Sequence, residues 1–98
     1  MKFEWDISKN DINFGKHGIR FEEAKEIFSG TVLTAIDDRS DYGEIRKISI
    51  GEAGGVIVIV VVHTDRRDVK RIISARRANK KERGKYYEYL KDIEKKNK

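Results

Sequence analysis

Seven consecutive branched apolar residues, Val56 to Val62, constrain the fold more than any other feature of the sequence. A half-exposed strand or an amphipathic helix would mix apolar with polar residues at a regular period, and this run has no polar face. Branched side chains favour extended backbone, and a strand without a polar face has to be covered on both sides. An exposed run of this kind would promote aggregation. We therefore expect it to be the central strand of a sheet.

The segments around this run supply its neighbours. Stretches with strand-like composition or alternation are separated by short polar or glycine-rich segments; the expected strands are 3–5, 31–36, 44–50, 56–62 and 69–77, and the expected turns are 37–43, 51–55 and 63–68. Tight turns between consecutive strands produce an antiparallel meander. The later part of the chain is therefore expected to form a meander around the apolar run.

Two helices are expected before the meander and one after it. The first covers about 9–16 and is capped by Ser8 or Asp6. The second covers about 20–28, where apolar residues recur with helical spacing. The third begins after Ala78, is weakened by Gly84, and frays over 95–98. The sequence thus predicts a small α+β domain in which all three helices pack on the meander.

Length and composition exclude several classes of protein. A chain of 98 residues is expected to form a single domain, spanning 1–98. It has no cysteine, which excludes disulfides and thiolate chemistry. A membrane span needs about 20 apolar residues, and the longest apolar run here is Val56 to Val62. We therefore expect a cytoplasmic protein. The only histidines, His17 and His63, lack partners at metal-ligand spacing. No metal and no cofactor are expected.

The positive charge is concentrated in the last third of the chain. Residues 70–98 contain 12 Lys or Arg and 4 Asp or Glu, a net charge of +8, whereas residues 1–69 carry −3. Clustered basic residues attract polyanions, chiefly nucleic acid. The alternative is a solvated basic surface without a specific partner. Charge alone favours nucleic acid only weakly.

Several cations are expected at the ends of strands. Arg46 shares a strand face with Ile48, and Arg76 and Arg77 end the last expected strand on opposite faces. Cations held on rigid strands are well placed to bind a phosphate. The alternative is that each simply reaches into water. His17 and Tyr86 likewise have ordinary structural explanations, as a residue near a helix C-terminus and as a packing residue.

Two blocks of the sequence resemble the BrnT-type toxins. The first comprises Trp5-Asp6, Lys9, Asn13, Lys16-His17-Gly18 and Phe21-Glu22-Glu23-Ala24. The second comprises Gly43-Glu44-x-Arg46, Arg71-Ile72-Ile73-Ser74-Ala75-Arg76-Arg77-Ala78, Glu82-Arg83 and Tyr86. The resemblance extends from about Phe3 to Tyr87, which is nearly the whole chain.

This resemblance implies a function that composition does not. BrnT-type toxins belong to type II toxin–antitoxin pairs, have a RelE-like fold, cleave RNA and arrest growth. The implied partner is a BrnA-type antitoxin with a ribbon-helix-helix DNA-binding region, in a 2:2 complex that binds operator DNA and represses the shared operon. The competing interpretation is a basic domain that binds nucleic acid, or serves as a repressor subunit, without catalysis.

The resemblance also suggests which residues would act on RNA. Metal-free cleavage needs a base, an acid, and cations for the charge that grows on the phosphate. His17 or Glu44 is expected to transfer protons. Arg46 and Arg76 are expected to hold the phosphate, with Tyr86 in a supporting role. The residues expected to bind RNA around them are Lys16, Arg71, Arg77, Lys80 and Lys81.

Overall fold

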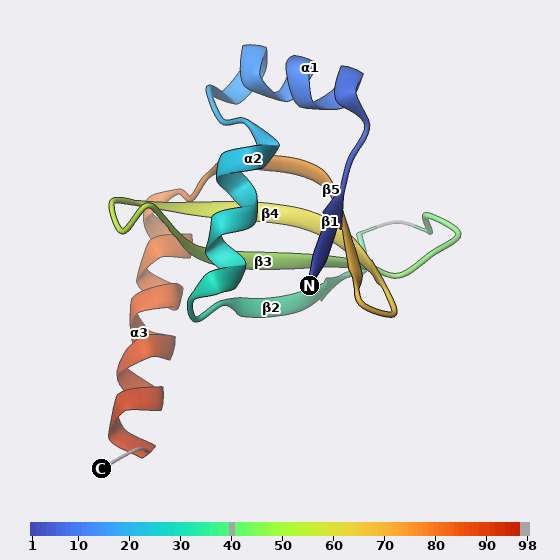
Figure 1. The fold of residues 1–98 in the computed structure, drawn as a ribbon. Coiled ribbons are helices and arrows are strands. Elements are labelled where there is room, and N and C mark those ends of the chain that lie inside the picture. The colour runs from blue at the N-terminus through green and yellow to red at the C-terminus, as the bar shows by residue number, and fades with distance from the viewer. Residues whose placement is uncertain (40, 97–98) are drawn as a thin grey trace.

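A five-stranded sheet lies at the centre of the structure, with the strand order β1-β5-β4-β3-β2 (Figure 1). The computed structural model describes residues 1–39 and 41–96. The strands are β1 (Lys2–Glu4), β2 (Leu33–Asp37), β3 (Arg46–Ala53), β4 (Ile57–Arg66) and β5 (Val69–Arg77), and the helices are α1 (Ile7–His17), α2 (Phe21–Ala24), the 3-10 helix η1 (Lys25–Ser29) and α3 (Lys80–Lys96). Strands β2 to β5 form the expected antiparallel meander, and β1 adds to β5 in parallel. The predicted α+β class is confirmed.

The apolar run supplies the middle strand of the sheet, and its two faces are covered by different helices. On one face Ile59 and Val61 are fully buried against Phe21 and Ile27 of α2 and η1. On the other face Val58 and Val60 pack with Ile50, Ala78 and Tyr86, which brings α3 onto the sheet. The requirement for cover on both faces is therefore met, except at Val56, which lies in the turn before β4 and is 85% exposed.

Two buried asparagines fix α1 and the segment that follows it. The side-chain nitrogen of Asn13 donates to the carbonyl oxygens of Ile19 and Ala75. Its side-chain oxygen accepts from the backbone amide of Ala75 at 3.1 Å. The Asn10 oxygen accepts from the Phe21 amide. Since Ala75 lies in β5, these bonds hold α1 beside that strand (Figure 1). They fix where the C-terminal end of α1 lies relative to the sheet.

Helix α3 begins with a reciprocal capping box. The Asn79 side chain accepts from the Glu82 amide at 2.8 Å, and the Glu82 carboxylate accepts from the Asn79 amide at 2.9 Å. One turn later the Tyr86 hydroxyl donates to the Thr31 carbonyl oxygen at 2.8 Å. The rest of the helix extends away from the sheet (Figure 1). No described helix is long and apolar enough to span a membrane.

Several predicted boundaries were wrong. The strand β3 continues through Ala53, and β4 continues through His63 to Arg66, where a turn was expected. The expected helix over 20–28 changes to a 3-10 helix at Lys25, and α1 begins at Ile7, before the expected start near residue 9. Of the two expected caps, Asp6 is the one that the structure shows, and the helix ends before Gly18, whose φ is +70°. The expected fraying over 95–98 falls partly outside the described residues.

Candidate functional site

A depression of about 240 Å³ opens on the sheet face opposite α2 and η1. It combines an apolar surface with cationic groups from three parts of the chain. The lining residues are Ile48, Val60 and Val62, together with His17, Arg39, Ser74 and Arg76. His17 comes from the last turn of α1, which the Asn13 hydrogen bonds hold beside β5. The fold therefore brings together an imidazole and two guanidinium groups that lie far apart in the sequence.

Each of the two guanidinium groups is held in place by a carboxylate. Arg76 donates to both oxygens of Glu82 at 2.8 Å, and Arg39 donates to both oxygens of Asp37 at 2.7 and 2.8 Å. These bonds lower the pKa of both carboxyl groups to about 2 and raise the pKa of each arginine. Bidentate pairs of this kind fix the plane of a guanidinium, so both cations are oriented before any anion binds.

The structure does not bring the remaining predicted catalytic residues to this depression. Glu44 is in the segment before β3 and contacts Arg66 at 3.5 Å. Arg46 stacks on the Tyr42 ring at 3.9 Å, and its buried Nε has no hydrogen-bond partner among the described residues. Tyr86 is 3% exposed, and its hydroxyl is bound to the Thr31 carbonyl. Of the expected catalytic group, only His17 and Arg76 line the depression.

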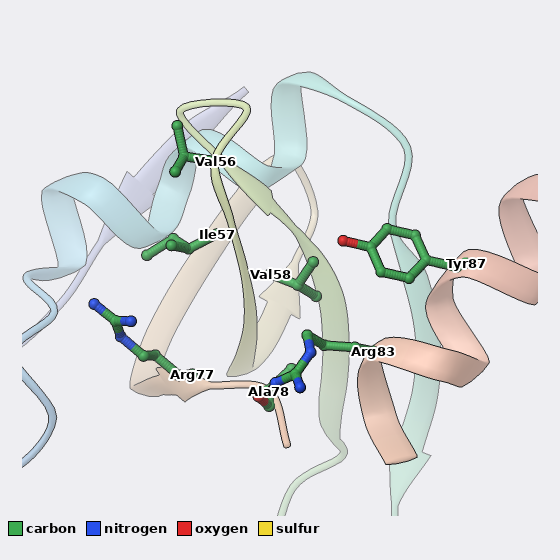
Figure 2. Close-up of a pocket in the computed structure, with 7 residues that line it drawn as sticks. All are labelled: Val56, Ile57, Val58, Arg77, Ala78, Arg83 and Tyr87. Carbon is green, nitrogen blue, oxygen red and sulfur yellow. Dashed lines mark hydrogen bonds between the residues drawn. The ribbon is translucent and has the colours of Figure 1, made fainter. Parts of the chain in front are cut away.

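The residues expected to bind RNA lie in several places. Lys16 lines a depression next to His17 on α1. Arg71 pairs with Glu4 at the β1 side of the sheet, at 3.3 Å. Lys80 and Lys81 are exposed in the first turn of α3. Arg77 lines a separate depression between the β3–β4 hairpin and α3 (Figure 2).

Sequence reasoning missed two residues of the site, Arg39 and Ser74. Arg39 lies in a segment that was expected to be only a turn. The spacing of Asp37 and Arg39 permits a local ion pair, but the sequence does not reveal that the Asp37 side chain is fully buried at the end of β2. Ser74 lies two residues before Arg76 on β5, and strand parity places both on one face, but Ser74 was not among the expected site residues.

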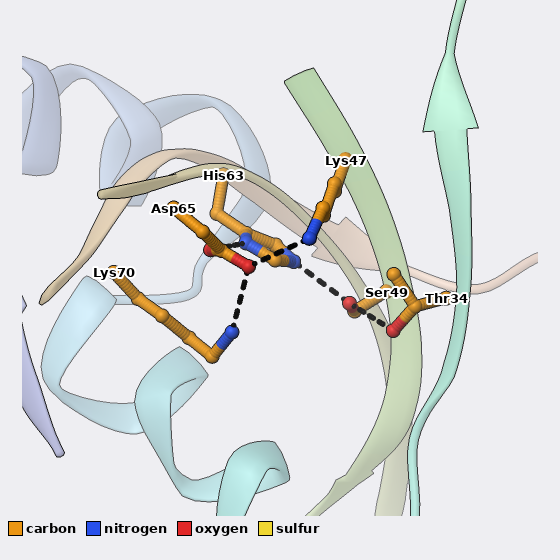
Figure 3. Close-up of polar contacts among 6 residues, drawn as sticks. All are labelled: Thr34, Lys47, Ser49, His63, Asp65 and Lys70. Atoms are coloured by element: carbon orange, nitrogen blue, oxygen red, sulfur yellow. Dashed lines mark hydrogen bonds and ion pairs between the residues drawn. The ribbon is translucent and has the colours of Figure 1, made fainter. Parts of the chain in front are cut away.

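A chain of hydrogen bonds, buried at its centre, crosses the opposite face of the sheet (Figure 3). The hydroxyls of Thr34 and Ser49 are 2.7 Å apart, Ser49 Oγ is 2.7 Å from His63 Nε2, and His63 Nδ1 is 2.7 Å from Asp65. Lys70 and Lys47 bind the other Asp65 oxygen at 3.0 and 3.2 Å. A carboxylate only accepts hydrogen bonds, so His63 carries its proton on Nδ1 and accepts from Ser49.

These hydrogen bonds connect serine, histidine and aspartate in the order found in some hydrolases, but their burial indicates a structural role. Ser49 and His63 are 0% and 1% exposed, and the Phe28 ring packs edge-on against the imidazole at 5.0 Å. Burial lowers the pKa of His63 and so favours the neutral imidazole. Burial acts to raise the pKa of Asp65, but hydrogen bonds from Lys70 and His63 lower it to about 2. No substrate can reach the serine.

The described residues contain no group of three or more His, Cys, Asp or Glu side chains placed to hold a metal ion. The ionisable groups at the depression are those of His17 and the two arginine–carboxylate pairs. Such a set can bind an anion and transfer a proton beside it.

Comparisons with known proteins agree with this chemistry. Residues 5–82 match a family model described as the ribonuclease toxin BrnT of type II toxin–antitoxin systems. The structure is similar to the crystal structure of the Brucella abortus ribonuclease toxin BrnT, with 30% identity and a TM-score of 0.62, over 82% of this chain and 99% of that one. No curated protein matches the chain significantly.

Proposed function

Because this chain belongs to the BrnT family of ribonuclease toxins of type II toxin–antitoxin systems, we propose that it cleaves RNA by general acid–base chemistry without a metal ion and thereby arrests growth. The observation that supports this proposal is the convergence of His17, Arg39 and Arg76 at one depression. These are the groups that a metal-free cleavage needs beside the scissile phosphate.

In the proposed reaction the depression binds the phosphate that follows the attacked ribose. A base removes the proton of the 2′-hydroxyl, the 2′-oxygen attacks phosphorus, and the 5′-oxygen leaves with a proton. His17 is the preferred residue for proton transfer, because it lines the depression and Glu44 does not. Lys16 adds a second ionisable group on the same turn of α1. The free N–H groups of Arg39 and Arg76 stabilise the charge that grows on the phosphate oxygens.

The family implies an antitoxin partner. We propose that it is of the BrnA type, with an acidic segment that covers cations of the C-terminal third and a separate ribbon-helix-helix region. The toxin and antitoxin form a 2:2 complex, and the toxin reaches operator DNA only through that complex. The alternative is a basic domain that binds nucleic acid and does not cleave it.

Cleavage of RNA by the purified protein in excess EDTA tests the enzyme proposal. The wild-type chain should cleave unmodified RNA in the chelator. His17→Ala should lose at least about 10²-fold in rate, as expected for a general acid or base. His17 is exposed, so this change should leave the midpoint of thermal unfolding unchanged. Lys91→Ala, which removes an exposed cation outside the depression, is the control.

Three results would contradict the proposal. Cleavage abolished by EDTA would exclude the metal-free route. Full activity of His17→Ala would exclude His17 as the proton-transfer group. Tight RNA binding without any cleavage, in a protein that still arrests growth, would favour the binding-only alternative.

A further inference from the structure

A second depression, of about 160 Å³, lies where β5 ends and the chain turns into α3 (Figure 2). One backbone hydrogen bond to β4 follows the end of β5: the Ala78 amide donates to the Val58 carbonyl oxygen at 3.0 Å. Beyond this bond, Val56 and Ile57 extend past the end of β5. The hairpin edge and the first two turns of α3 therefore enclose an open space.

The lining of this depression combines two cations with an aromatic ring and apolar side chains. Arg77 and Arg83 contribute guanidinium groups, Tyr87 contributes a ring that is 45% exposed, and Val56 is 85% exposed. Arg83 is held by a 2.9 Å hydrogen bond to the Ala78 carbonyl oxygen. In Figure 2 the Tyr87 side chain points from α3 toward the hairpin. None of the described residues that line the depression is acidic.

This composition matches a nucleotide better than a hydrophobic ligand or a peptide strand. A base can stack on the exposed Tyr87 ring, and the Arg83 guanidinium, on the same side of the hairpin in Figure 2, can bind its phosphate. Such stacking is independent of base identity because every base has an aromatic face. The absence of a carboxylate among the described lining residues leaves both cations available to an anion.

The chain itself connects this depression to the candidate active site. Arg76 lines the site with His17, whereas the next residue, Arg77, lines the second depression. Two neighbouring residues of α3 likewise serve the two depressions: Glu82 holds Arg76 at the candidate active site, and Arg83 lines the second depression. The two depressions thus lie on either side of the same short stretch of backbone.

We propose that the second depression binds another nucleotide of the RNA substrate, outside the cleaved linkage, by stacking on Tyr87 and by contact of its phosphate with Arg83. This inference rests on the proposed function. The family match ends at Glu82, so Arg83 and Tyr87 lie beyond the matched region. The subsite would thus depend on residues of α3 that follow the matched region.

The test measures binding of a fluorescent RNA of about ten nucleotides whose 2′-hydroxyls are methylated, so that it cannot be cleaved. Tyr87→Ala should weaken binding about tenfold, whereas Tyr87→Phe should bind normally because the ring remains. Arg83→Gln should also reduce the slope of log K against log salt by about 0.7, the value for one phosphate contact on a single strand. Lys91→Gln removes one cation from elsewhere on α3 and should keep the wild-type slope.

Thermal unfolding of each variant checks that α3 still packs, and cleavage of unmodified RNA by the wild-type chain tests the proposed function separately. Binding by Tyr87→Ala and Arg83→Gln that equals that of Lys91→Gln would overturn the subsite, even if the wild type cleaves RNA. Variants that lose antitoxin binding and keep RNA binding would overturn it too, because the depression would then be a protein-docking site. A wild type that binds the methylated RNA through Tyr87 and never cleaves would retain the subsite and reject the enzyme proposal.

Discussion

At the scale of single residues, Gly51 fixes how closely the 3-10 helix η1 approaches the sheet. A Cβ atom at this position would lie 2.8 Å from Ile27 Cβ and 3.1 Å from Val32 Cγ1. Its backbone is regular strand, so the glycine is needed for space and not for an unusual φ angle. The sequence could not reveal this, because Gly51 begins a glycine-rich stretch that indicated only a turn.

Replacement of Gly51 by Ala should therefore destabilise the protein. The added methyl group forces Ile27 or the backbone to move, and overpacking of this kind costs about 1–3 kcal/mol. Gly84→Ala is the matched comparison, because no described atom outside the backbone of α3 lies within 4 Å of its added Cβ, and α3 is a regular helix there. That change should stabilise the protein by up to about 1 kcal/mol. Urea unfolding measures both; a Gly51→Ala variant as stable as wild type would contradict the close approach.

The candidate site was predictable at some residues and not at others. His17 and Arg76 were expected from the family resemblance, and the structure places both at one depression. Arg46 was expected beside them on the basis of strand parity, but parity fixes only the face of the sheet and not the position along it. Arg46 begins β3 two residues before Ile48, and its side chain stacks on the Tyr42 ring and does not line the depression. The partnership of Arg39 with a buried aspartate depends on a tertiary contact, and no periodicity indicates it.

At the scale of elements, the hydrogen-bonded chain from Thr34 to Asp65 joins the strands on one face of the sheet. The polar sequence after Val62 indicated a turn, yet β4 continues through His63 and Asp65. On the face of His63 and Asp65 the strand can continue because the polar groups have partners: Ser49 binds the imidazole, and lysines bind the carboxylate. The hydroxyl of Thr64, on the other face, is buried without a hydrogen-bond partner among the described residues. Polar composition predicts a turn only when such partners are missing, and partners on other strands are not visible in the local sequence.

The stability of this element should depend on pH through His63. Burial lowers its pKa in the folded protein, so the unfolded chain binds the proton more readily. The free energy of unfolding should therefore fall as pH decreases below about 6.5, by at most about 1.4 kcal/mol per pH unit. Asp65, Asp37 and Glu82 have folded pKa values of about 2. Their contributions change only at lower pH, below their unfolded values.

Urea unfolding between about pH 7.5 and 5 measures this effect. His63→Gln should reduce the pH dependence, because glutamine keeps a hydrogen-bonding side chain and does not titrate. His17→Ala is the control for the second histidine and should keep the slope due to His63. A wild-type free energy of unfolding that stays constant over this range would show that the buried imidazole accepts a proton without cost.

At the scale of the whole molecule, the architecture followed from the sequence because one run determined it. Seven branched apolar residues had to lie in a covered strand, and the flanking turns then required an antiparallel meander. Boundaries were less predictable, since they depend on partners from distant elements. The structure also shows which cations of the basic C-terminal third are in ion pairs and which are exposed. Ion pairs engage Lys70, Arg71 and Arg76, whereas exposed cations such as Lys80 and Lys81 remain on α3.

This charge distribution leads to a prediction about the antitoxin. Residues 70–98 carry a net charge of +8, so an acidic antitoxin segment should be attracted to them over long distances. Complementary charge raises the association rate constant chiefly at low salt. Salt screens it, since the Debye length decreases from about 10 Å at 0.1 M to about 3 Å at 1 M. The association rate should therefore fall about tenfold or more between low and high salt.

Stopped-flow association with the proposed antitoxin tests this prediction, and limited proteolysis of the complex shows whether α3 is covered. A double variant, Lys80→Gln with Lys81→Gln, should weaken the salt dependence, because it removes two exposed cations from the first turn of α3. The alternative is an apolar interface elsewhere on the molecule that leaves the basic helix free. In that case the rate would not depend on salt, α3 would stay protease-sensitive in the complex, and the double variant would associate like wild type.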